Sequence, residues 1–279
     1  MRQISTDEIT KTVRNLCIEA CTVLGTDVLN QVRRALEVET SRTGRMVLEK
    51  IIQNAEIALR EKMPLCQDTG MAVVFLEIGQ DVHFNGGLLY DAINEGVRQG
   101  YRDGYLRKST LDPISRKNLG DNTPAVIHAE IVSGDKLKII FAPKGFGSEN
   151  MSRVMMFPPS AGIEGVKEFI VQRIIESGGN PCPPIVVGVG LGGTFEKSAL
   201  LAKKALLRPI GSENPDLTLN ALEKELLAKI NATGIGPMGL GGNTTALAVH
   251  INSYPTHIAS LPVAVNIQCH SCRHAEAIL

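Results

Sequence analysis

The residues best suited to chemistry are three cysteines in loop-like segments that lie far apart in the sequence. Cys66 begins the segment Cys-Gln-Asp-Thr-Gly, which follows a helical pattern and precedes an apolar strand. Cys182 lies between prolines, and Cys269 lies between a glutamine and a histidine. Thiolates bind zinc and iron–sulfur clusters. Three of them, flanked by amide and carboxylate side chains, suggest an iron–sulfur cluster with one iron left open to a substrate.

A fourth thiol leaves other kinds of metal site open. Cys269 and Cys272 form a Cys-x-x-Cys pair, so that with Cys66 and Cys182 they could build a closed zinc site or a cluster that only stores electrons. A structural zinc site usually uses two closely spaced pairs, and this chain has one. Scattered single ligands favour a site that the whole fold assembles.

The remaining two cysteines, Cys17 and Cys21, are one helical turn apart, and Cys17 lies on an apolar stripe. Because free cysteine is common in protein cores, we expect both to pack there.

Composition and charge exclude several classes of function. The 279 residues include 29 Lys and Arg and 29 Asp and Glu, so no basic surface for nucleic acid or acidic lipid is expected. No apolar run approaches the roughly 20 residues of a membrane span. The polar N-terminal segment is typical of a helix rather than a signal peptide. Six cysteines without such a signal indicate a reducing compartment, and we expect a cytoplasmic protein.

Hydrophobic periodicity predicts the elements that position these residues. Residues 1–65 show three helical stripes, with a start signal at Ser5–Asp7 and a stop at Pro64. Further helices are predicted at 86–105, 160–177, 195–207 and 215–230. Strands are predicted at 71–78, 185–189, in TTALAVHI and in LPVAVNIQC, and residues 124–142 are predicted to form a hairpin that turns at Ser133–Asp135.

These elements predict an α+β fold. An N-terminal helical segment precedes a mixed α/β part that carries the cluster site on loops. Because no linker or internal repeat is evident, residues 1–279 are expected to form one domain, with residues 1–65 as its helical arm.

Residues 188–193 match the dinucleotide motif Gly-x-Gly-x-x-Gly between a strand and a helix. However, that helix runs into a polar loop with no second apolar strand, so the strand–helix–strand unit of the motif is missing. We expect these glycines to allow close packing of the strand and helix.

Five segments, in order, resemble the signature blocks of class I, iron–sulfur-dependent fumarases. They are CQDTG, APKGFGSEN, NPCPPIVVGVGLGGT, GIGPMGLGGNTTALAVHI and HIASLPVAVNIQCHSCRHAEA. The similarity extends from about residue 10 to the C-terminus and is closest to the separate α subunit of the two-subunit form. The same family includes L-tartrate dehydratase α subunits.

The resemblance implies a [4Fe–4S] cluster with three ligands, which here match Cys66, Cys182 and Cys269. It implies that the fourth iron acts as a Lewis acid on the carboxylate and hydroxyl of a small dicarboxylate. Cys272 is then a neighbour of the cluster rather than a ligand.

The resemblance also implies the residues that meet the substrate. By position, Gln67, Arg107 and Gly145 match substrate-binding residues, with Gly145 offering its backbone. Asp68 and His257 match residues at the reacting centre and are the candidate catalytic residues, with Asp68 sharing in proton transfer.

The function that the resemblance implies is a hydro-lyase subunit that hydrates fumarate reversibly to L-malate, a step of the tricarboxylic acid cycle. Single-chain relatives continue into a further domain, so the resemblance implies a separate β subunit, with α2β2 as the expected heteromer. The C-terminal block favours fumarate. The alternatives are an L-tartrate dehydratase α subunit, which forms oxaloacetate, and a non-catalytic zinc or electron-transfer module.

Overall fold

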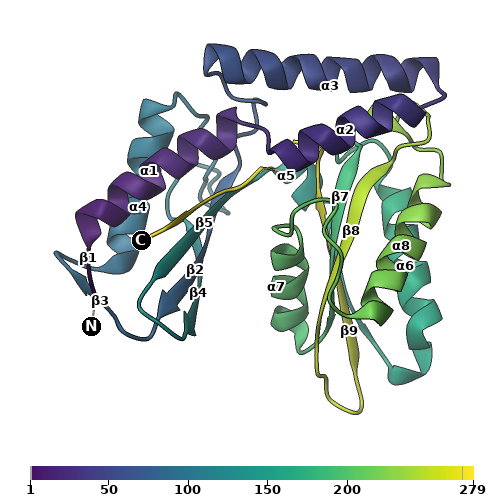
Figure 1. Ribbon diagram of the computed structural model, residues 1–279. Coiled ribbons are helices and arrows are strands. Elements are labelled where there is room, and N and C mark those ends of the chain that lie inside the picture. The colour runs from purple at the N-terminus through teal and green to yellow at the C-terminus, as the bar shows by residue number, and fades with distance from the viewer. Residues whose placement is uncertain (1, 272) are drawn as a thin grey trace. The chain divides into compact units, whose positions relative to one another are not determined.

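The computed structural model describes residues 2–271 and 273–279 (Figure 1). Internal contacts divide the chain into two compact units. Unit 1 comprises Met1–Leu24, Ala55–Gly145 and Arg273–Leu279, and unit 2 comprises Gly25–Asn54 and Phe146–Cys272. The predicted α+β class is confirmed, because helices and mixed sheets occur together. The arm at residues 1–65 contributes to both units, and its place in a single domain stays a prediction.

The N-terminal segment is helical, as predicted. It forms α1 (Thr6–Thr22), α2 (Thr26–Val38) and α3 (Arg42–Glu61). The start signal is confirmed, because the Ser5 hydroxyl accepts a hydrogen bond from the Asp7 N–H at 3.2 Å. Within the described residues, no helix is long and apolar enough to cross a membrane.

The main sheet of unit 1 has the strand order β10-β5-β2-β4, and α1 and α4 lie over it (Figure 1). Its strands are β2 (Met71–Gly79), β4 (Val126–Val132), β5 (Leu137–Lys144) and β10 (Ala275–Ile278), and α4 spans Leu89–Asp103. A separate two-stranded sheet pairs β1 (Arg2–Ser5) with β3 (Val82–Asn85). Strand β2 lies between two other strands of this sheet and follows the Cys66 segment directly, so the end of this segment is attached to a rigid strand.

The predicted hairpin at 124–142 is wrong. Both strands exist, as β4 and β5, but β2 lies between them, parallel to β4 and antiparallel to β5. The physical reason is burial. Residues 72–76 of β2 are consecutively buried, which suits a central strand, whereas β4 is mostly exposed and suits an edge.

Unit 2 is built on a sheet with the strand order β6-β9-β7-β8. Helix α7 covers one face, and α6 and α8 cover the other (Figure 1). The strands are β6 (Arg153–Phe157), β7 (Ile185–Gly192), β8 (Ala246–Tyr254) and β9 (Leu261–Gln268). The helices are α5 (Phe146–Glu149), α6 (Gly162–Ser177), α7 (Phe195–Ala205) and α8 (Leu217–Asn231), with 3₁₀ turns at Pro159–Ala161 and Pro237–Gly239.

The glycines of the dinucleotide-like motif serve packing, as expected. A Cβ atom at Gly190 would lie 1.9 Å from the Ser198 carbonyl oxygen, and one at Gly188 would lie 2.2 Å from that of Ala202. These positions therefore let α7 lie directly on β7. The expected absence of a parallel strand is wrong, because β8 pairs parallel to β7. The sequence pattern missed this pairing because the crossover contains both α7 and α8.

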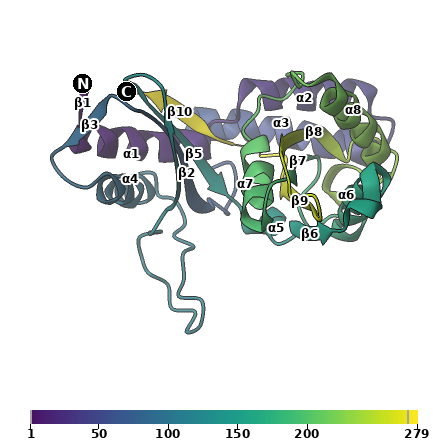
Figure 2. The ribbon, with the colours of Figure 1, turned by 90° about the horizontal axis from the view of Figure 1, so that it is seen from below.

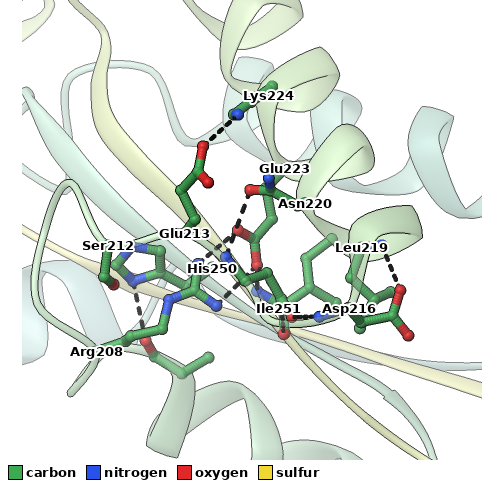
Figure 3. Close-up of polar contacts among 12 residues, drawn as sticks. Arg208, Ser212, Glu213, Asp216, Leu219, Asn220, Glu223, Lys224, His250 and Ile251 are labelled. Atoms are coloured by element: carbon green, nitrogen blue, oxygen red, sulfur yellow. Dashed lines mark hydrogen bonds and ion pairs between the residues drawn. The ribbon is translucent and has the colours of Figure 1, made fainter.

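The outer edge of β8 is closed by side chains rather than by another strand. The Glu223 carboxylate accepts hydrogen bonds from the Ile251 N–H at 2.7 Å, from Asn214 Nδ2 at 2.8 Å and from Arg208 Nη1 at 2.9 Å (Figure 3). Asn214 Nδ2 also lies 3.0 Å from the Ile251 carbonyl oxygen. Edge strands expose unpaired backbone groups. At Ile251, Glu223 accepts from the N–H group and Asn214 donates to the carbonyl group.

His250 lies beside this cluster and is 2% exposed (Figure 3). Its Nδ1 lies 3.1 Å from the Ala205 carbonyl oxygen, so Nδ1 carries the hydrogen. Burial, reinforced by the charge of Arg208 and opposed by those of Glu223 and Asp27, lowers the pKa of His250 to about 4. The fold therefore favours the neutral imidazole.

We predict that this histidine weakens the fold in acid. Because the pKa of His250 is depressed in the folded state, its stabilisation is complete above the unfolded value of about 6.5 and is lost as the pH falls toward 4. The loss approaches about 3 kcal/mol. Urea unfolding from pH 7 to 4.5 should show a shallower loss of stability in His250→Asn than in the wild type. The exposed His257→Asn serves as control and should retain the wild-type slope, and equal slopes in all three proteins would contradict the assignment.

Candidate functional site

The loop Cys66–Gly70, here called the CQDTG turn, is held by its main-chain carbonyl groups. The buried Tyr101 hydroxyl lies 2.6 Å from the Thr69 carbonyl oxygen and 3.2 Å from that of Gly70. Asn122 Nδ2 donates to the Gly70 carbonyl at 3.1 Å. Tyr101 and Asn122 are both completely buried, so these tethers are shielded from water.

The conformation of the turn depends on glycine at its end. Gly70 has φ +73°, and a Cβ atom there would lie 2.5 Å from the Lys144 nitrogen. Any other residue would be strained and would collide with β5. The turn therefore lies directly against the end of that strand.

The side chains of the turn remain accessible. Cys66 and Gln67 are exposed and Asp68 is half-buried. The Asp68 N–H lies 3.4 Å from Cys66 Sγ, and Asp68 Oδ1 accepts from the Gly70 N–H at 2.9 Å. The other carboxylate oxygen lies toward Gly145, where a Cβ atom would be 3.2 Å from it. Unit 1 thus brings together a thiol, a carboxylate and the main chain of Gly145.

Arg107 belongs to the same neighbourhood. It lies in the long segment between α4 and β4, which extends away from the sheet of unit 1 (Figure 2). The Thr69 hydroxyl donates to the Arg107 carbonyl at 2.9 Å, so the main chain of Arg107 is tied to the turn. Its side chain is exposed. The predicted residues Gln67, Asp68, Arg107 and Gly145 therefore all lie at or beside the turn.

Cys182 and Cys269 lie at the same end of the sheet of unit 2. Cys182 precedes β7 and Cys269 follows β9, which is antiparallel to β7. His270 joins the two loops, because its Nδ1 lies 3.0 Å from the Cys182 carbonyl oxygen. Cys182 has φ +57°, a strained conformation for a residue with a side chain. Such strain is a reason to suspect function at this position.

His257 is not brought to these two cysteines within unit 2. It lies in the loop before β9, whereas Cys269 follows the end of that strand. The eight residues of β9 separate the two by roughly 25 Å at about 3.3 Å per residue. His257 is exposed, and its Nδ1 accepts from the Ala259 N–H at 3.2 Å. Its predicted catalytic role therefore gains no support from its position.

The chemistry of the thiols separates two groups of cysteines. Cys17 and Cys21 are completely buried, as expected. Burial raises the pKa of Cys17 well above its usual range and that of Cys21 to about 11, so both stay protonated. Protonated thiols are poor metal ligands.

The three cysteines chosen from the sequence differ from this buried pair. Cys66 and Cys182 are exposed and Cys269 is partly exposed, so their sulfur atoms fit a soft metal centre. Within either unit, the described residues contain no group of three His, Cys, Asp or Glu side chains that could hold a metal ion by itself. Cys272 lies outside the described residues.

Arg273 is a residue that sequence reasoning missed. It is 4% exposed, and its Nη2 donates to the Asp68 carbonyl in the CQDTG turn. Its Nε and Nη1 have no hydrogen-bond partner among the described residues. The sequence offered only its place four residues after Cys269, which does not show burial.

Two cavities in unit 2 lie apart from the predicted residues. One of about 490 Å³ lies between β6 and α6, and one of about 200 Å³ lies along β8 beside Glu223. Neither is lined by a residue that the sequence analysis selected for the site.

Comparison with known proteins shows the family of this chain. Residues 10–278 match the family model described as "Fumarate hydratase (Fumerase)". A Methanocaldococcus jannaschii protein, provisionally named L(+)-tartrate dehydratase subunit alpha, is 44% identical over 274 residues, covering 96% of each chain. The L(+)-tartrate dehydratase subunit alpha of Escherichia coli K12 is 31% identical over 282 residues, covering 100% of this chain and 93% of that protein. With nearly its whole length matched, the chain belongs to the fumarate hydratase family of hydro-lyases.

Proposed function

We propose that this chain is the α subunit of an enzyme that hydrates fumarate reversibly to L-malate. The observation that carries the proposal is the CQDTG turn, which presents the exposed Cys66 thiol, the Gln67 amide and the Asp68 carboxylate. Hydrogen bonds from buried side chains to the main-chain carbonyl groups hold its backbone in place. In a member of the fumarate hydratase family, this arrangement offers a metal ligand and polar substrate contacts side by side.

Cys66, Cys182 and Cys269 would hold a [4Fe–4S] cluster. When bound, the cluster supplies a Lewis acid for the hydroxyl group that leaves malate. The accessibility of these three thiols, against the protonated state of Cys17 and Cys21, supports the choice of ligands.

Asp68 is the proposed group for moving the proton at C3 of malate. Loss of water from malate removes this proton and the C2 hydroxyl group, and the C3 proton is too weakly acidic to leave without a positioned base. Hydrogen bonding from Gly70 orients one oxygen of the Asp68 carboxylate, while the other lies toward Gly145. The absence of a side chain at Gly145 leaves room for this carboxylate.

Substrate binding requires cationic and polar partners, because fumarate and malate are dianions at neutral pH. Arg107 has an exposed guanidinium on a main chain that is tied to the turn. A guanidinium can bind a carboxylate through two parallel hydrogen bonds. Gln67 can donate to a carboxylate or hydroxyl oxygen from within the turn itself.

A β subunit is the proposed partner, in an α2β2 assembly. The relatives are named as alpha subunits, and this chain matches them over nearly their full length. The exposed Arg107 guanidinium also supplies only half of the counter-charge of a dianion, so further cations from a partner would complete the site.

L-tartrate is the second candidate substrate, and the names of the relatives favour it. Tartrate is malate with a second hydroxyl group, and loss of water from it gives oxaloacetate. The amide of Gln67 could hydrogen-bond the extra hydroxyl.

We predict that the three proposed ligands are individually required for iron. After anaerobic reconstitution, serine at Cys66, Cys182 or Cys269 should lower the iron and sulfide content and the visible absorbance of the cluster to background. Cys272→Ala should retain the wild-type content. A wild-type iron content in any of the three serine variants would contradict the proposal. Loss of metal in Cys272→Ala would indicate a four-thiol site, as in the non-catalytic zinc or electron-transfer alternative.

We predict that turnover requires both subunits and the Asp68 carboxylate. Assayed anaerobically with fumarate, L-malate and L-tartrate in parallel, the α and β subunits together should favour fumarate and malate, and the α subunit alone should be inactive. Asp68→Asn should lower kcat by at least about 100-fold while retaining the iron, because general acid–base groups commonly contribute this much.

Preferential turnover of L-tartrate would contradict fumarate as the substrate and support L-tartrate in its place. Robust activity of the α subunit alone would refute the need for a partner. Wild-type turnover by Asp68→Asn would exclude Asp68 as the proton-transferring group.

A further inference from the structure

A long connection in unit 1, residues 104–125 between α4 and β4, extends away from the sheet of that unit (Figure 2). Residues 105–121 of this connection are here called the arm. Connections longer than about 12–15 residues are uncommon in compact domains and are usually either functional or disordered. This one is held at its base by the completely buried Asn122, whose Oδ1 accepts from the Ser109 N–H at 2.7 Å and from the Thr110 N–H at 3.1 Å. The arm is therefore ordered, which makes it a candidate for function.

The tip of the arm is a hydrogen-bonded turn. Asp112 Oδ1 accepts from the Ile114 N–H at 3.1 Å and from the Ser115 N–H at 2.7 Å. The main chain closes the same turn, because the Asp112 N–H donates to the Lys117 carbonyl at 2.9 Å and the Arg116 N–H donates to the Asp112 carbonyl at 3.0 Å. A tip that is already folded in this way loses little conformational freedom when a partner binds it.

The turn presents an apolar side chain to the solvent. Ile114 is 92% exposed. Single exposed apolar side chains are common on protein surfaces. The exposure of Ile114, however, is set by the rigid turn, which holds this side chain out at the tip of the arm. An apolar side chain held in this way is suited to insert into a pocket of another protein and to anchor the contact.

The arm is basic. Its cationic residues are Arg107, Lys108, Arg116 and Lys117. Its two carboxylates are engaged within the chain, Asp112 by the N–H groups of the turn and Asp121 by Arg98 Nε at 2.9 Å. The whole chain has 29 basic and 29 acidic residues, so this excess of positive charge is local. The matching surface on a partner is an apolar pocket rimmed by carboxylates.

The base of the arm belongs to the candidate site. The Thr69 hydroxyl donates to the Arg107 carbonyl at 2.9 Å, and Asn122 Nδ2 donates to the Gly70 carbonyl at 3.1 Å. Asn122 thus fixes the arm and the CQDTG turn together, and a partner that docks on the arm is tethered to this turn.

The β subunit is the occupant that best fits this arm. It is the partner that the proposed function brings to the CQDTG turn, where it would supply further cations. A second copy of this chain fits less well, because a two-fold contact between two arms would bring their basic residues together.

We propose that the arm is the docking element for the β subunit, with Ile114 inserted into an apolar pocket and with Arg116 and Lys117 facing carboxylates at its rim. This inference rests on the proposed function, because it takes the chain to be the α subunit of a two-subunit enzyme.

The test measures binding of the full-length α subunit to the β subunit by surface plasmon resonance under anaerobic conditions. Ile114→Ser should weaken the affinity at least about tenfold, because it removes a buried anchor. Ile131→Ser is the matched control, since Ile131 is 76% exposed in the same unit but lies in β4, outside the arm, and it should retain the wild-type affinity.

Reversing the charges of the tip should act on the rate of association. The double variant Arg116→Glu and Lys117→Glu should bind the β subunit at least about tenfold more slowly at low salt, and the difference should shrink as the salt concentration rises. Urea unfolding and iron content should be unchanged in all variants, because the altered side chains are exposed. At saturating β subunit, Ile114→Ser should reach the wild-type kcat, because the site itself is intact.

Three results would overturn the proposal. The first is an affinity of Ile114→Ser within about twofold of the wild type, or no weaker than that of Ile131→Ser. The second is lost self-association of the α subunit in Ile114→Ser with unchanged binding to the β subunit, which would assign the tip to a second copy of this chain. The third is a wild-type α subunit that does not bind the β subunit.

Failure of the proposed reaction would look different. Binding that depends on Ile114, without turnover of fumarate, L-malate or L-tartrate by the complex, would reject the proposed function and retain the arm as the docking element.

Discussion

The anchoring of the CQDTG turn through main-chain carbonyl groups is the constraint on which the proposed chemistry depends. The carbonyls of Asp68, Thr69 and Gly70 accept hydrogen bonds from the buried side chains of Arg273, Tyr101 and Asn122. Because the backbone rather than the side chains is held, Cys66 and Gln67 stay exposed while their positions are fixed. Buried hydrogen bonds shielded from water are well suited to this task, since a loosely held turn would misplace every group on it.

Unit 2 uses the same principle with different residues. His270 donates to the carbonyl of Cys182, so the loop before β7 is tied to the loop after β9 through the main chain. Both Cys182 and Cys269 stay accessible as a result. In each unit a buried strand adjoins the cysteine segment and a side chain remote in sequence fixes its backbone. The two units therefore present their thiols by the same physical means.

Sequence periodicity could predict the long helices and strands but not which strands pair with one another. Helices α1 to α4 and strands β2, β7, β8 and β9 show strong apolar patterns, because each buries a regular face. The hairpin was wrong because alternation indicates which face of a strand is buried, not which strand lies beside it. The short strands β1, β3, β6 and β10 were missed, since four or five residues carry little periodic signal.

The candidate site was predictable only where a residue acts through its own chemistry. Cys66, Cys182 and Cys269 stand out by type and context, and Asp68 by its place beside Cys66. Tyr101, Asn122 and Arg273 act through backbone carbonyls that are distant in sequence or hidden in a turn, and such contacts leave no local pattern. His257 was selected from its place in a segment that resembles the family, and such a segment does not indicate at which end of the sheet a residue lies.

Two arginines of unit 2, the half-buried Arg208 and the buried Arg173, are each balanced by a glutamate. Arg208 leaves its Nε unpaired, but Glu223 balances its charge through the other two nitrogens. Arg173 is paired with Glu176. The fold thus balances a buried cation where that cation serves packing or closes a sheet edge.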